Sequence, residues 1–411
     1  MKQIKLQKLD QPIRSAIRLA SSKSESNRAL IIQALAKENI VLQNLSEARD
    51  TQTMMRLLKS QDKELDVLDA GTTMRFLLAY CTVARPGSTL KGTPRMHQRP
   101  VKLLVDALSQ LGAKVKYIEN EGFPPVLLEG LPEGQQQATV SIRGDVSSQY
   151  ISALLMIAPT LPQGLKLSLE GKVGSRPYIS MTLGLMQRFG IKYRWEENII
   201  TVEAQAYKSG DYTIESDWSG ASYWYSLVAL AEDAEVKLLG LRKDSLQGDI
   251  AIVEIMEKLG VVSEFDEEGV LLKKKEAAQE FHYDFSDCPD LAQTVAVTCA
   301  AKGIPCTMTG LESLRIKETD RIAALRQELN KMGASLLEDK NTWELKAGRN
   351  PQTIEGLQIH TYEDHRMAMA FAPLSALMEM VIDEPDVVVK SYPGFWKDLD
   401  QAGVKSEIKD A

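Results

Sequence analysis

The chain has 411 residues, of which 44% are hydrophobic and 26% charged, a length and composition typical of a globular protein with two domains. Its formal net charge of -7 at pH 7 repels nucleic acid and anionic membranes, so we expect neither as a partner. No apolar run reaches the ~18 residues that cross a bilayer, and the four cysteines show no CxxC spacing, which favours a cytoplasmic protein with buried free thiols.

Two kinds of helix alternate along the chain. The first kind is apolar nearly all round, which predicts burial on every side, and its members begin near residues 24, 73, 148, 219, 290 and 366. These starts are 49, 75, 71, 71 and 76 residues apart, which indicates six repeated units with the first one shortened. The second kind is amphipathic and ends at a hydrophobic residue followed by glycine, as Met332 and Gly333 do in "TDRIAALRQELNKMGA".

Strand-like segments with turn residues follow each amphipathic helix, so every unit would supply a buried helix, a covering helix and a few strands. The predicted fold class is therefore α/β. Three units on either side of a break near "YKSGDYTIESDW" predict two domains of similar build. The N-terminal strand "QIKLQKL" fits either half, and one large irregular α/β protein with accidental spacing remains the alternative here.

Small hydroxyl, Asp or Gly residues open the buried helices, often beside a Lys or Arg. Capping of the helix amides explains the hydroxyl groups. It does not explain the cations, because a positive charge at the positive end of a helix is unfavourable by ~0.3 to 1 kcal/mol. An anion bound there reverses the sign, so the pattern favours phosphate or carboxylate sites. The residues concerned are Lys23, Ser24, Arg28, Asp69, Gly71, Thr72, Arg75, Ser147, Ser148, Gln149, Asp217, Ser219, Asp287, Asp290, Asp364, His365 and Arg366.

The stretch "LRIKETDR" concentrates charge at the start of an amphipathic helix. Lys317 and Arg321 flank a start that we expect Thr319 to cap, an unfavourable place for two cations unless an anion binds between them. Glu318 is a carboxylate among these cations and is therefore a candidate proton carrier. A solvated charge cluster on a surface helix is the alternative interpretation.

Three other positions carry weaker signals. Arg95 and Arg99 in "RMHQRP" are spaced to hold one anion or to line a loop. Asp290 follows Pro289 at the first turn of a buried helix, as a general base or as a complement to the helix dipole. Lys390 ends the β-branched run "VVVK", as a strand-end lysine or as a charge directed into a cleft. Neither phosphate-loop nor HExxH nor GxSxG patterns occur, which disfavours nucleotide, metal and serine-nucleophile chemistry.

In order, the motifs resemble those of the 5-enolpyruvylshikimate-3-phosphate synthase family over nearly the whole chain. They are "SSKSESNRALIIQALA", "DAGTTMRFLLAY", "GTPRMHQRPVKLLVDAL", "GDVSSQYISALLMIAP", "RPYISMTLGLMQRFG", "CPDLAQTVAV", "LRIKETDRIAAL" and "TYEDHRMAMAF". The resemblance implies two domains, each of three βαβαββ units, with the active site in the interdomain cleft and domain closure over the substrates. We expect one domain to span residues 1–19 and 217–411, and the other residues 20–216.

The resemblance also implies transfer of the enolpyruvyl group of phosphoenolpyruvate to the 5-hydroxyl of shikimate 3-phosphate, with release of phosphate and without a cofactor or metal. Such an enzyme serves aromatic amino acid and chorismate biosynthesis, and we expect a monomer. By motif, phosphoenolpyruvate would contact Lys23, Gly71, Arg99, Gln149, Arg321, Arg366 and Lys390. Shikimate 3-phosphate would contact Ser24, Arg28, Ser147, Ser148, Gln149, Ser175, Tyr178, Asp290, Ser313 and Lys317. Asp290 resembles the base for the hydroxyl proton and Glu318 the acid for the methylene carbon, with Lys23 and His365 nearby.

Several positions depart from the family pattern. Asp69 replaces the usual Asn, and we expect it to weaken phosphoenolpyruvate binding or to pair with a neighbouring cation. Ser313 stands where some members have Asn, so one substrate contact is expected to be shortened or water-bridged. Phe76 stands where others have proline or leucine, and the first unit lacks a hairpin arm after "TMMRLLKSQDKEL".

Two alternative functions share parts of this pattern. The sister enzyme that acts on UDP-N-acetylglucosamine carries a reactive cysteine in a mobile loop, and the comparable stretch "GTPRMHQRP" has none. A catalytically silent scaffold that binds anionic metabolites would tolerate loss of Asp290 and Glu318, and both are present. Enolpyruvyl transfer to shikimate 3-phosphate is therefore the favoured prediction.

Overall fold

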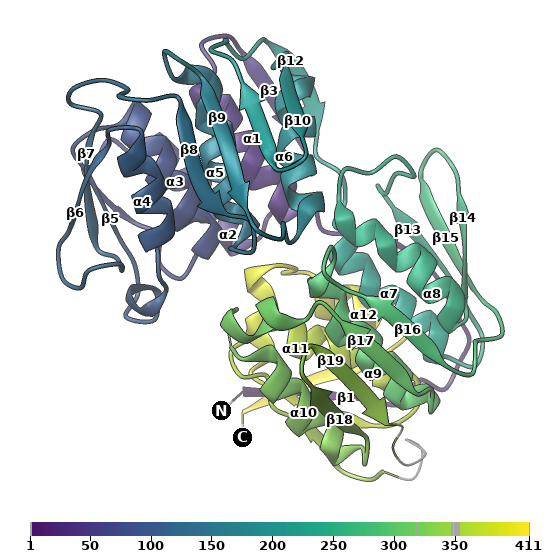
Figure 1. The fold of residues 1–411 in the computed structure, drawn as a ribbon. Helices are drawn as coiled ribbons and strands as arrows, with labels where there is room; N and C mark the ends of the chain where they lie inside the picture. The colour runs from purple at the N-terminus through teal and green to yellow at the C-terminus, as the bar shows by residue number, and fades with distance from the viewer. Residues whose placement is uncertain (1, 318, 347, 349–353, 411) are drawn as a thin grey trace. The chain divides into compact units, whose positions relative to one another are not determined.

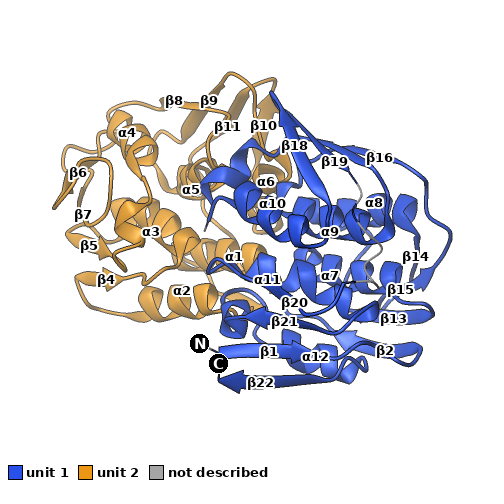
Figure 2. Ribbon diagram, turned by 90° about the horizontal axis from the view of Figure 1, so that it is seen from below, with its two compact units in different colours: residues 1–20, 215–411 blue, residues 21–214 orange. Residues whose placement is uncertain are grey.

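The computed structural model describes residues 2–317, 319–346, 348 and 354–410 (Figure 1). The chain divides into two compact units (Figure 2). Unit 1 comprises residues 1–20 and 215–411, and unit 2 comprises residues 21–214.

Helices and strands alternate in both units. Unit 2 contains β3 (Ile40–Gln43), β4 (Glu64–Asp66), β5 (Ser88–Lys91), β6 (Lys114–Tyr117), β7 (Val126–Gly130), β8 (Thr139–Arg143), β9 (Leu165–Glu170), β10 (Tyr193–Glu196), β11 (Ile199–Val202), β12 (Gly210–Thr213), α1 (Lys23–Leu35), α2 (Arg49–Lys59), α3 (Gly71–Ala84), α4 (Lys102–Gln110), α5 (Ser148–Ile157) and α6 (Arg176–Arg188). Unit 1 contains β1 (Lys2–Leu6), β2 (Ile13–Arg18), β13 (Ala234–Leu239), β14 (Val261–Phe265), β15 (Gly269–Lys274), β16 (Phe281–Asp284), β17 (Cys306–Thr309), β18 (Ser335–Asp339), β19 (Thr342–Lys346), β20 (Leu357–Ile359), β21 (Met380–Asp383), β22 (Ser406–Asp410), α7 (Trp218–Leu230), α8 (Ile252–Leu259), α9 (Ala292–Lys302), α10 (Arg321–Lys331), α11 (His365–Phe371) and α12 (Phe395–Gln401).

The six apolar helices form the centres of the two units. They are α1, α3 and α5 in unit 2, which pack on one another, and α7, α9 and α11 in unit 1, which do the same. All thirteen residues of α7 are buried, because this helix has no polar face to turn toward water. The prediction of buried helices at these six places is confirmed.

Amphipathic helices alternate with the buried ones, as predicted. The helices α4, α6, α8, α10 and α12 each end shortly before a glycine with a positive φ angle, a conformation that strains residues with a Cβ. The φ of Gly333 after α10, for example, is 72°. The turn chemistry of the sequence thus sets where the covering helices end.

Sheets of one pattern recur through the described residues. Five sheets have four strands, and in the order β4-β5-β7-β6 the first two strands are parallel while the last two form an antiparallel hairpin. The sixth sheet has two strands, β12 and β3. Strand β3 belongs to the first of the six sequence repeats, which is predicted to lack a hairpin arm after "TMMRLLKSQDKEL". In the structure α2 is followed directly by β4, so this prediction is confirmed.

Two strands are exchanged between the halves of the chain. Strand β2 directly precedes α1 in the sequence, yet it pairs in parallel with β13 of unit 1. Strand β12 directly precedes α7, yet it pairs in parallel with β3 of unit 2. The first strand, β1, pairs with β21 and β22, so the N-terminal segment completes a sheet of unit 1.

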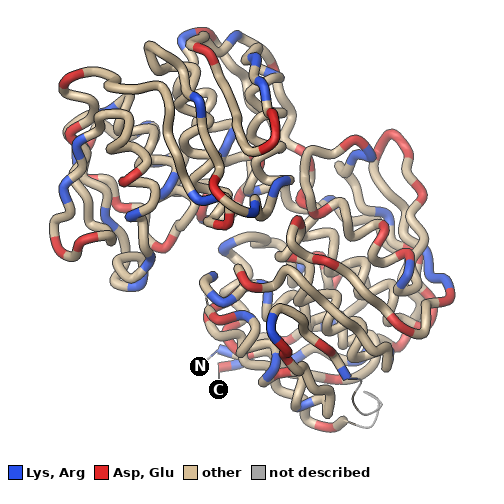
Figure 3. The backbone as a smooth tube through the Cα atoms, viewed as in Figure 1, with Lys and Arg blue, Asp and Glu red and all other residues tan. Residues whose placement is uncertain are grey.

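The charged residues are spread over both units (Figure 3), and the four cysteines are buried. Acidic and basic residues are interspersed along the backbone of each unit (Figure 3). Cys81, Cys288, Cys299 and Cys306 are buried free thiols. Across the described part of the chain, no helix is both long and apolar enough to cross a bilayer.

Candidate active site

Three helix starts of unit 1 bring cations onto Asp290. Asp290 lies in the 3₁₀ turn η4 (Pro289–Leu291) that leads into α9, and its side chain is 14% exposed. Arg321, the first residue of α10, donates from Nη1 to Oδ1 at 2.8 Å, and Arg366 of α11 donates from Nη2 to Oδ2 at 3.0 Å. The Lys317 Nζ lies 3.8 Å from Oδ1. Each carboxylate oxygen of Asp290 therefore faces at least one cation.

A second carboxylate, Asp364, contacts the side chain of Arg321 and the backbone of Arg366. Asp364 is fully buried, caps α11 by accepting from the Arg366 amide at 2.8 Å, and accepts from the Arg321 Nε at 2.6 Å. His365, next to it, is buried, with Nδ1 3.7 Å from the Asp364 Oδ1. Buried cations are stable only when they are paired and hydrogen-bonded, so Asp364 helps to set where the Arg321 guanidinium points, while it fixes the backbone start of α11 that carries Arg366.

The start of α10 differs from the prediction. Asp320, not Thr319, caps the helix by accepting from the Ala323 amide at 3.0 Å, so the predicted cap is wrong. A carboxylate is the better acceptor at the positive end of a helix, and Asp320 is the residue adjacent to the first helical position. Arg315 pairs with this cap, with 3.6 Å between Nη1 and the Asp320 Oδ2. The predicted acid Glu318 lies outside the described residues.

Lys390 does not end a strand. It is the last residue of the 3₁₀ helix η8 (Pro385–Lys390) and is only 9% exposed. The β-branched run failed to predict its conformation because Pro385 opens a helical turn, where its fixed φ and missing N–H are both accommodated. Ser313 lies half-buried in the 3₁₀ helix η5 (Glu312–Ile316).

The second group of predicted residues lies in unit 2, around Arg28. The Arg28 side chain donates from Nε to the Thr182 Oγ1 at 2.7 Å and from Nη2 to the Ser152 Oγ at 3.2 Å. Its guanidinium carbon lies 5.4 Å from the ring centre of Phe76 and 5.9 Å from that of Tyr178. Burial lowers the pKa of Arg28 to about 10, because desolvation penalises its charge. A buried cation close to two aromatic rings is well arranged to receive an anion.

Helix starts bring polar groups toward the same part of unit 2. Ser147 caps α5 by accepting from the Gln149 amide at 3.4 Å, and the Gln149 Nε2 donates to the Thr72 Oγ1 at 3.0 Å. The Lys23 Nζ lies 3.9 Å from the Asp50 Oδ2. These contacts join α1 to α2 and α3 to α5 at their N-terminal ends. Ser24 lies on the first turn of α1, Ser148 opens α5, and Ser175, with a φ of 50°, and Tyr178 lie at the start of α6.

Gly71 gives the guanidinium groups of Arg75 and Arg99 room to lie against the start of α3. A Cβ placed on Gly71 would lie 2.5 Å from the Arg99 Nη1 and 2.8 Å from the Arg75 Nη1. Both atoms are at the ends of flexible side chains, so an alanine can be accommodated by displacing them. We predict that Gly71→Ala folds normally but weakens the binding of a phosphate-bearing anion at this helix start roughly 10-fold. Titration of the anion and a melting curve measure both effects, and an unchanged affinity would contradict this role for Gly71.

Asp69 pairs with a neighbouring cation, which is one of the two outcomes expected for this position. Its Oδ2 accepts from the Arg49 Nη2 at 2.5 Å. This pairing offsets the negative charge that the residue adds near the start of α3.

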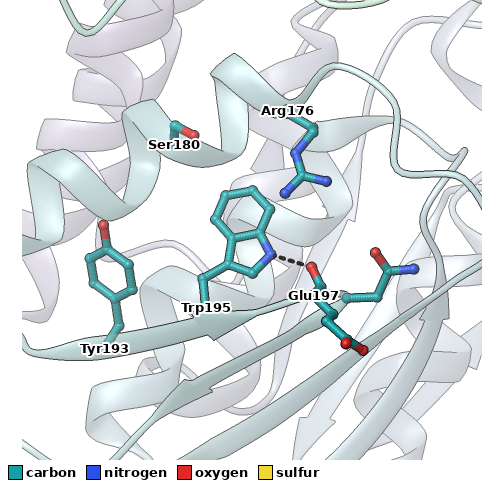
Figure 4. Close-up of a pocket in the computed structure, with 6 residues that line it drawn as sticks. Arg176, Ser180, Tyr193, Trp195 and Glu197 are labelled. Carbon is teal, nitrogen blue, oxygen red and sulfur yellow. Dashed lines mark hydrogen bonds between the residues drawn. The ribbon is translucent and has the colours of Figure 1, made fainter.

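A separate open pocket lies where the β10–β11 hairpin faces the start of α6 (Figure 4). The Arg176 guanidinium carbon lies 4.6 Å from the Trp195 ring centre, and the Trp195 Nε1 donates to the Glu197 carbonyl at 3.1 Å. The residues that line it are Arg176, Ser180, Tyr193, Trp195, Glu197 and Asn198. None of these six residues is a predicted binding residue. Within the described part of the chain, this pocket is therefore distinct from the groups of predicted residues around Asp290 and Arg28.

Some residues of these clusters gave no usable sequence signal. Thr182 and Ser152, the partners of Arg28, look like ordinary polar residues of buried helices. Tyr223, whose hydroxyl accepts from the Arg366 Nη1 at 3.4 Å, lies in an apolar run. Asp364 stood inside a recognised motif, but its pairing with Arg321 joins residues 43 positions apart, which local pattern does not reveal.

The comparisons with known proteins agree with this architecture. The model of the EPSP synthase (3-phosphoshikimate 1-carboxyvinyltransferase) family matches residues 8–62 and 59–399. A 3-phosphoshikimate 1-carboxyvinyltransferase of Bacteroides fragilis (strain YCH46) is 49% identical over 398 residues, 95% of this chain and 96% of that protein. One from Sulfurovum sp. (strain NBC37-1) is 36% identical over 419 residues, with 94% and 96% covered. The structure of an EPSP synthase from Acinetobacter baumannii superimposes with a TM-score of 0.81 at 20% identity, covering both chains fully.

Two units, each built of three repeats with a buried helix and a covering helix, define the two-domain enolpyruvyl transferase fold. The predicted fold class is thereby confirmed. Among proteins of this fold, the chain belongs to the EPSP synthase family. The family resemblance drawn from the sequence motifs is confirmed with it.

Proposed function

We propose that this protein transfers the enolpyruvyl group of phosphoenolpyruvate to the 5-hydroxyl of shikimate 3-phosphate and releases phosphate. The observation that carries the proposal is the arrangement of Arg321, Arg366 and Lys317 around Asp290 at converging helix starts. It supplies a carboxylate base among cations that suit anionic substrates. Relatives named for this activity, up to 49% identical over nearly the full length, support the choice of reaction.

In this proposal Asp290 removes the proton of the acceptor hydroxyl as its oxygen attacks the substituted carbon of phosphoenolpyruvate. Glu318 gives a proton to the methylene carbon, and loss of a proton with the phosphate then restores the double bond. Asp290 now holds Arg321 and Arg366, which we expect to turn toward the incoming anion when substrate binds. The base is thereby released from its ion pairs at the moment it is needed.

The remaining predicted residues divide between the two substrates. We propose that phosphoenolpyruvate is held by Lys23, Gly71, Arg99, Gln149, Arg321, Arg366 and Lys390. We propose that shikimate 3-phosphate is held by Ser24, Arg28, Ser147, Ser148, Gln149, Ser175, Tyr178, Asp290, Ser313 and Lys317. Helix N-termini and guanidinium groups are well suited to both, since each substrate carries several negative charges. A cytoplasmic monomer acting in aromatic amino acid biosynthesis completes the proposal.

The test is phosphate release from phosphoenolpyruvate with shikimate 3-phosphate as acceptor, run in parallel with UDP-N-acetylglucosamine. We expect release with shikimate 3-phosphate alone. Release only with the sugar nucleotide would assign the protein to the sister reaction. Release with neither acceptor would overturn enolpyruvyl transfer as its function.

A further inference from the structure

Asp249 is a buried carboxyl group that the proposed mechanism does not use. It lies in the 3₁₀ turn η3 (Gly248–Ala251) before α8 and is 4% exposed. Its Oδ2 accepts a hydrogen bond from the Ser219 hydroxyl at the start of α7. Its Oδ1 is buried and has no hydrogen-bond partner among the described residues. A buried carboxyl with one unsatisfied oxygen is costly to keep in a fold, which suggests a role beyond packing.

A network of hydrogen bonds holds the loop that carries Asp249 in place. Gln247 accepts from the Trp218 amide at 3.0 Å and donates to the Ser216 carbonyl at 2.8 Å. Glu215 accepts from the Trp218 indole at 2.9 Å. The loop is therefore tied through Gln247 to residues 215–218, directly before Ser219, and Asp249 is a fixed neighbour of that helix end.

Arg366 links Asp249 to the proposed base. Its Nη2 donates to the Asp290 Oδ2 at 3.0 Å and also to the Ser219 hydroxyl at 3.4 Å. Ser219 can accept from Arg366 while it donates to Asp249, because a hydroxyl has one donor and two acceptor positions. One nitrogen of Arg366 is thus shared between Asp290 and the Ser219–Asp249 pair.

The groups that face Asp249 favour its neutral form. Burial raises the pKa of Asp249 to about 7, and the negative charges of Asp290 and Asp217 add to this, while Arg366 and the Ser219 hydroxyl act in the opposite direction. The thiol of Cys288 also faces Asp249, and the Asp249 charge raises the pKa of that thiol. Asp249 therefore stays neutral to a higher pH than an exposed aspartate does.

We propose that Asp249 is a positioning residue for Arg366, and this inference rests on the proposed transfer reaction. In its protonated form Asp249 holds Ser219, and through it the Arg366 guanidinium, and leaves the guanidinium charge to the substrate. In its ionised form it adds a second negative charge behind Arg366. That charge competes with phosphoenolpyruvate for the guanidinium and repels it, so substrate binding weakens above pH 7.

The decisive variant is Asp249→Asn, which keeps an acceptor for Ser219 and cannot ionise. We expect the KM of the wild type for phosphoenolpyruvate to rise by roughly 10-fold relative to that of Asp249→Asn between pH 6 and pH 8.5, with kcat changing in parallel in both. The matched control is Asp244→Asn, which removes the same charge from an exposed position of the same loop. It should follow the wild type. Identical KM profiles for wild type and Asp249→Asn would overturn the inference.

A melting series tests the charge state without turnover. The pKa of Asp249 is higher in the folded protein than in the unfolded chain, where it is ~3.9. Below pH ~3.9 the carboxyl is neutral in both states, so its raised pKa does not lower the stability of the fold. The resulting loss of stability grows as the pH rises toward about 7 and is constant above it. The melting temperature of Asp249→Asn relative to wild type should therefore increase between pH 5 and pH 7 and then level off. A difference that does not vary with pH would overturn the inference.

Ser219→Ala covers the case in which Asp249→Asn does not fold. It cuts the link to Arg366, so we expect a higher KM for phosphoenolpyruvate at pH 6, and an unchanged KM would count against the linkage. Phosphate release by the wild type alone tests the proposed function. If the wild type releases no phosphate with shikimate 3-phosphate, both ideas fail. If it does and the variants behave as the wild type does, only the role of Asp249 is lost.

Discussion

Asp290→Asn is expected to lower kcat for phosphate release by about 100-fold or more, as loss of a general base does. Asparagine has the same size and can still accept from one of the two arginines, but its amide cannot take the hydroxyl proton. The neighbouring Asp364 still pairs with Arg321, so the fold should survive. Steady-state kinetics with both substrates varied, together with a melting curve, measure the effect.

The split between kcat and KM separates the two roles of Asp290. A residue that only neutralises Arg321 and Arg366 would, when replaced, change mainly the KM for phosphoenolpyruvate. A base would change kcat. Asp287→Asn is the matched control, because Asp287 is an exposed acid three positions earlier in the same segment. Near-normal kcat in Asp290→Asn would remove this residue from the proton transfer.

Arg28→Met should weaken shikimate 3-phosphate binding by at least ~30-fold, because losing a buried charge contact to an anion costs about 2 kcal/mol or more. Met fills a similar length without charge. Since burial already disfavours the Arg28 cation, the variant should melt at or above the wild-type temperature. Titration calorimetry with shikimate 3-phosphate provides the affinity, and thermal unfolding the stability.

Arg188→Met is the matched control for this variant, an exposed arginine at the end of α6. It should bind like the wild type. Arg28→Lys adds a second comparison: it retains a charge but loses the planar fork, so we expect partial recovery of affinity. Wild-type affinity in Arg28→Met would exclude Arg28 from the binding site.

The fold was largely predictable, because its strongest signals are local. An apolar periphery on α7 predicts complete burial from the thirteen residues of the helix alone. Glycine after α10 predicts its end from one position. The exceptions were also local: Pro385 turned a β-branched run into a 3₁₀ helix, and Asp320 replaced Thr319 as a cap. In both places a neighbouring residue with a stronger conformational or capping preference determined the local structure.

The motifs named Asp290, Arg321 and Arg366 as candidate site residues, and the structure brings these three side chains together. The motifs did not reveal that Asp290 holds both arginines, or that Asp364 pairs with the Arg321 side chain. Asp249 gave no signal at all, because nothing in "LQGDI" distinguishes a buried carboxyl from a loop acid.

By itself the sequence determined the six repeats, the two kinds of helix and the motif residues at the helix starts. These depend on side-chain periodicity and capping within about 10 residues, where covalent neighbours decide conformation. Only the tertiary structure decided the strand exchange of β2 and β12 and the ion pairs at the helix starts. Those contacts join residues as far apart as Asp290 and Arg366, 76 positions along the chain, and burial forces each charge there to find its partner.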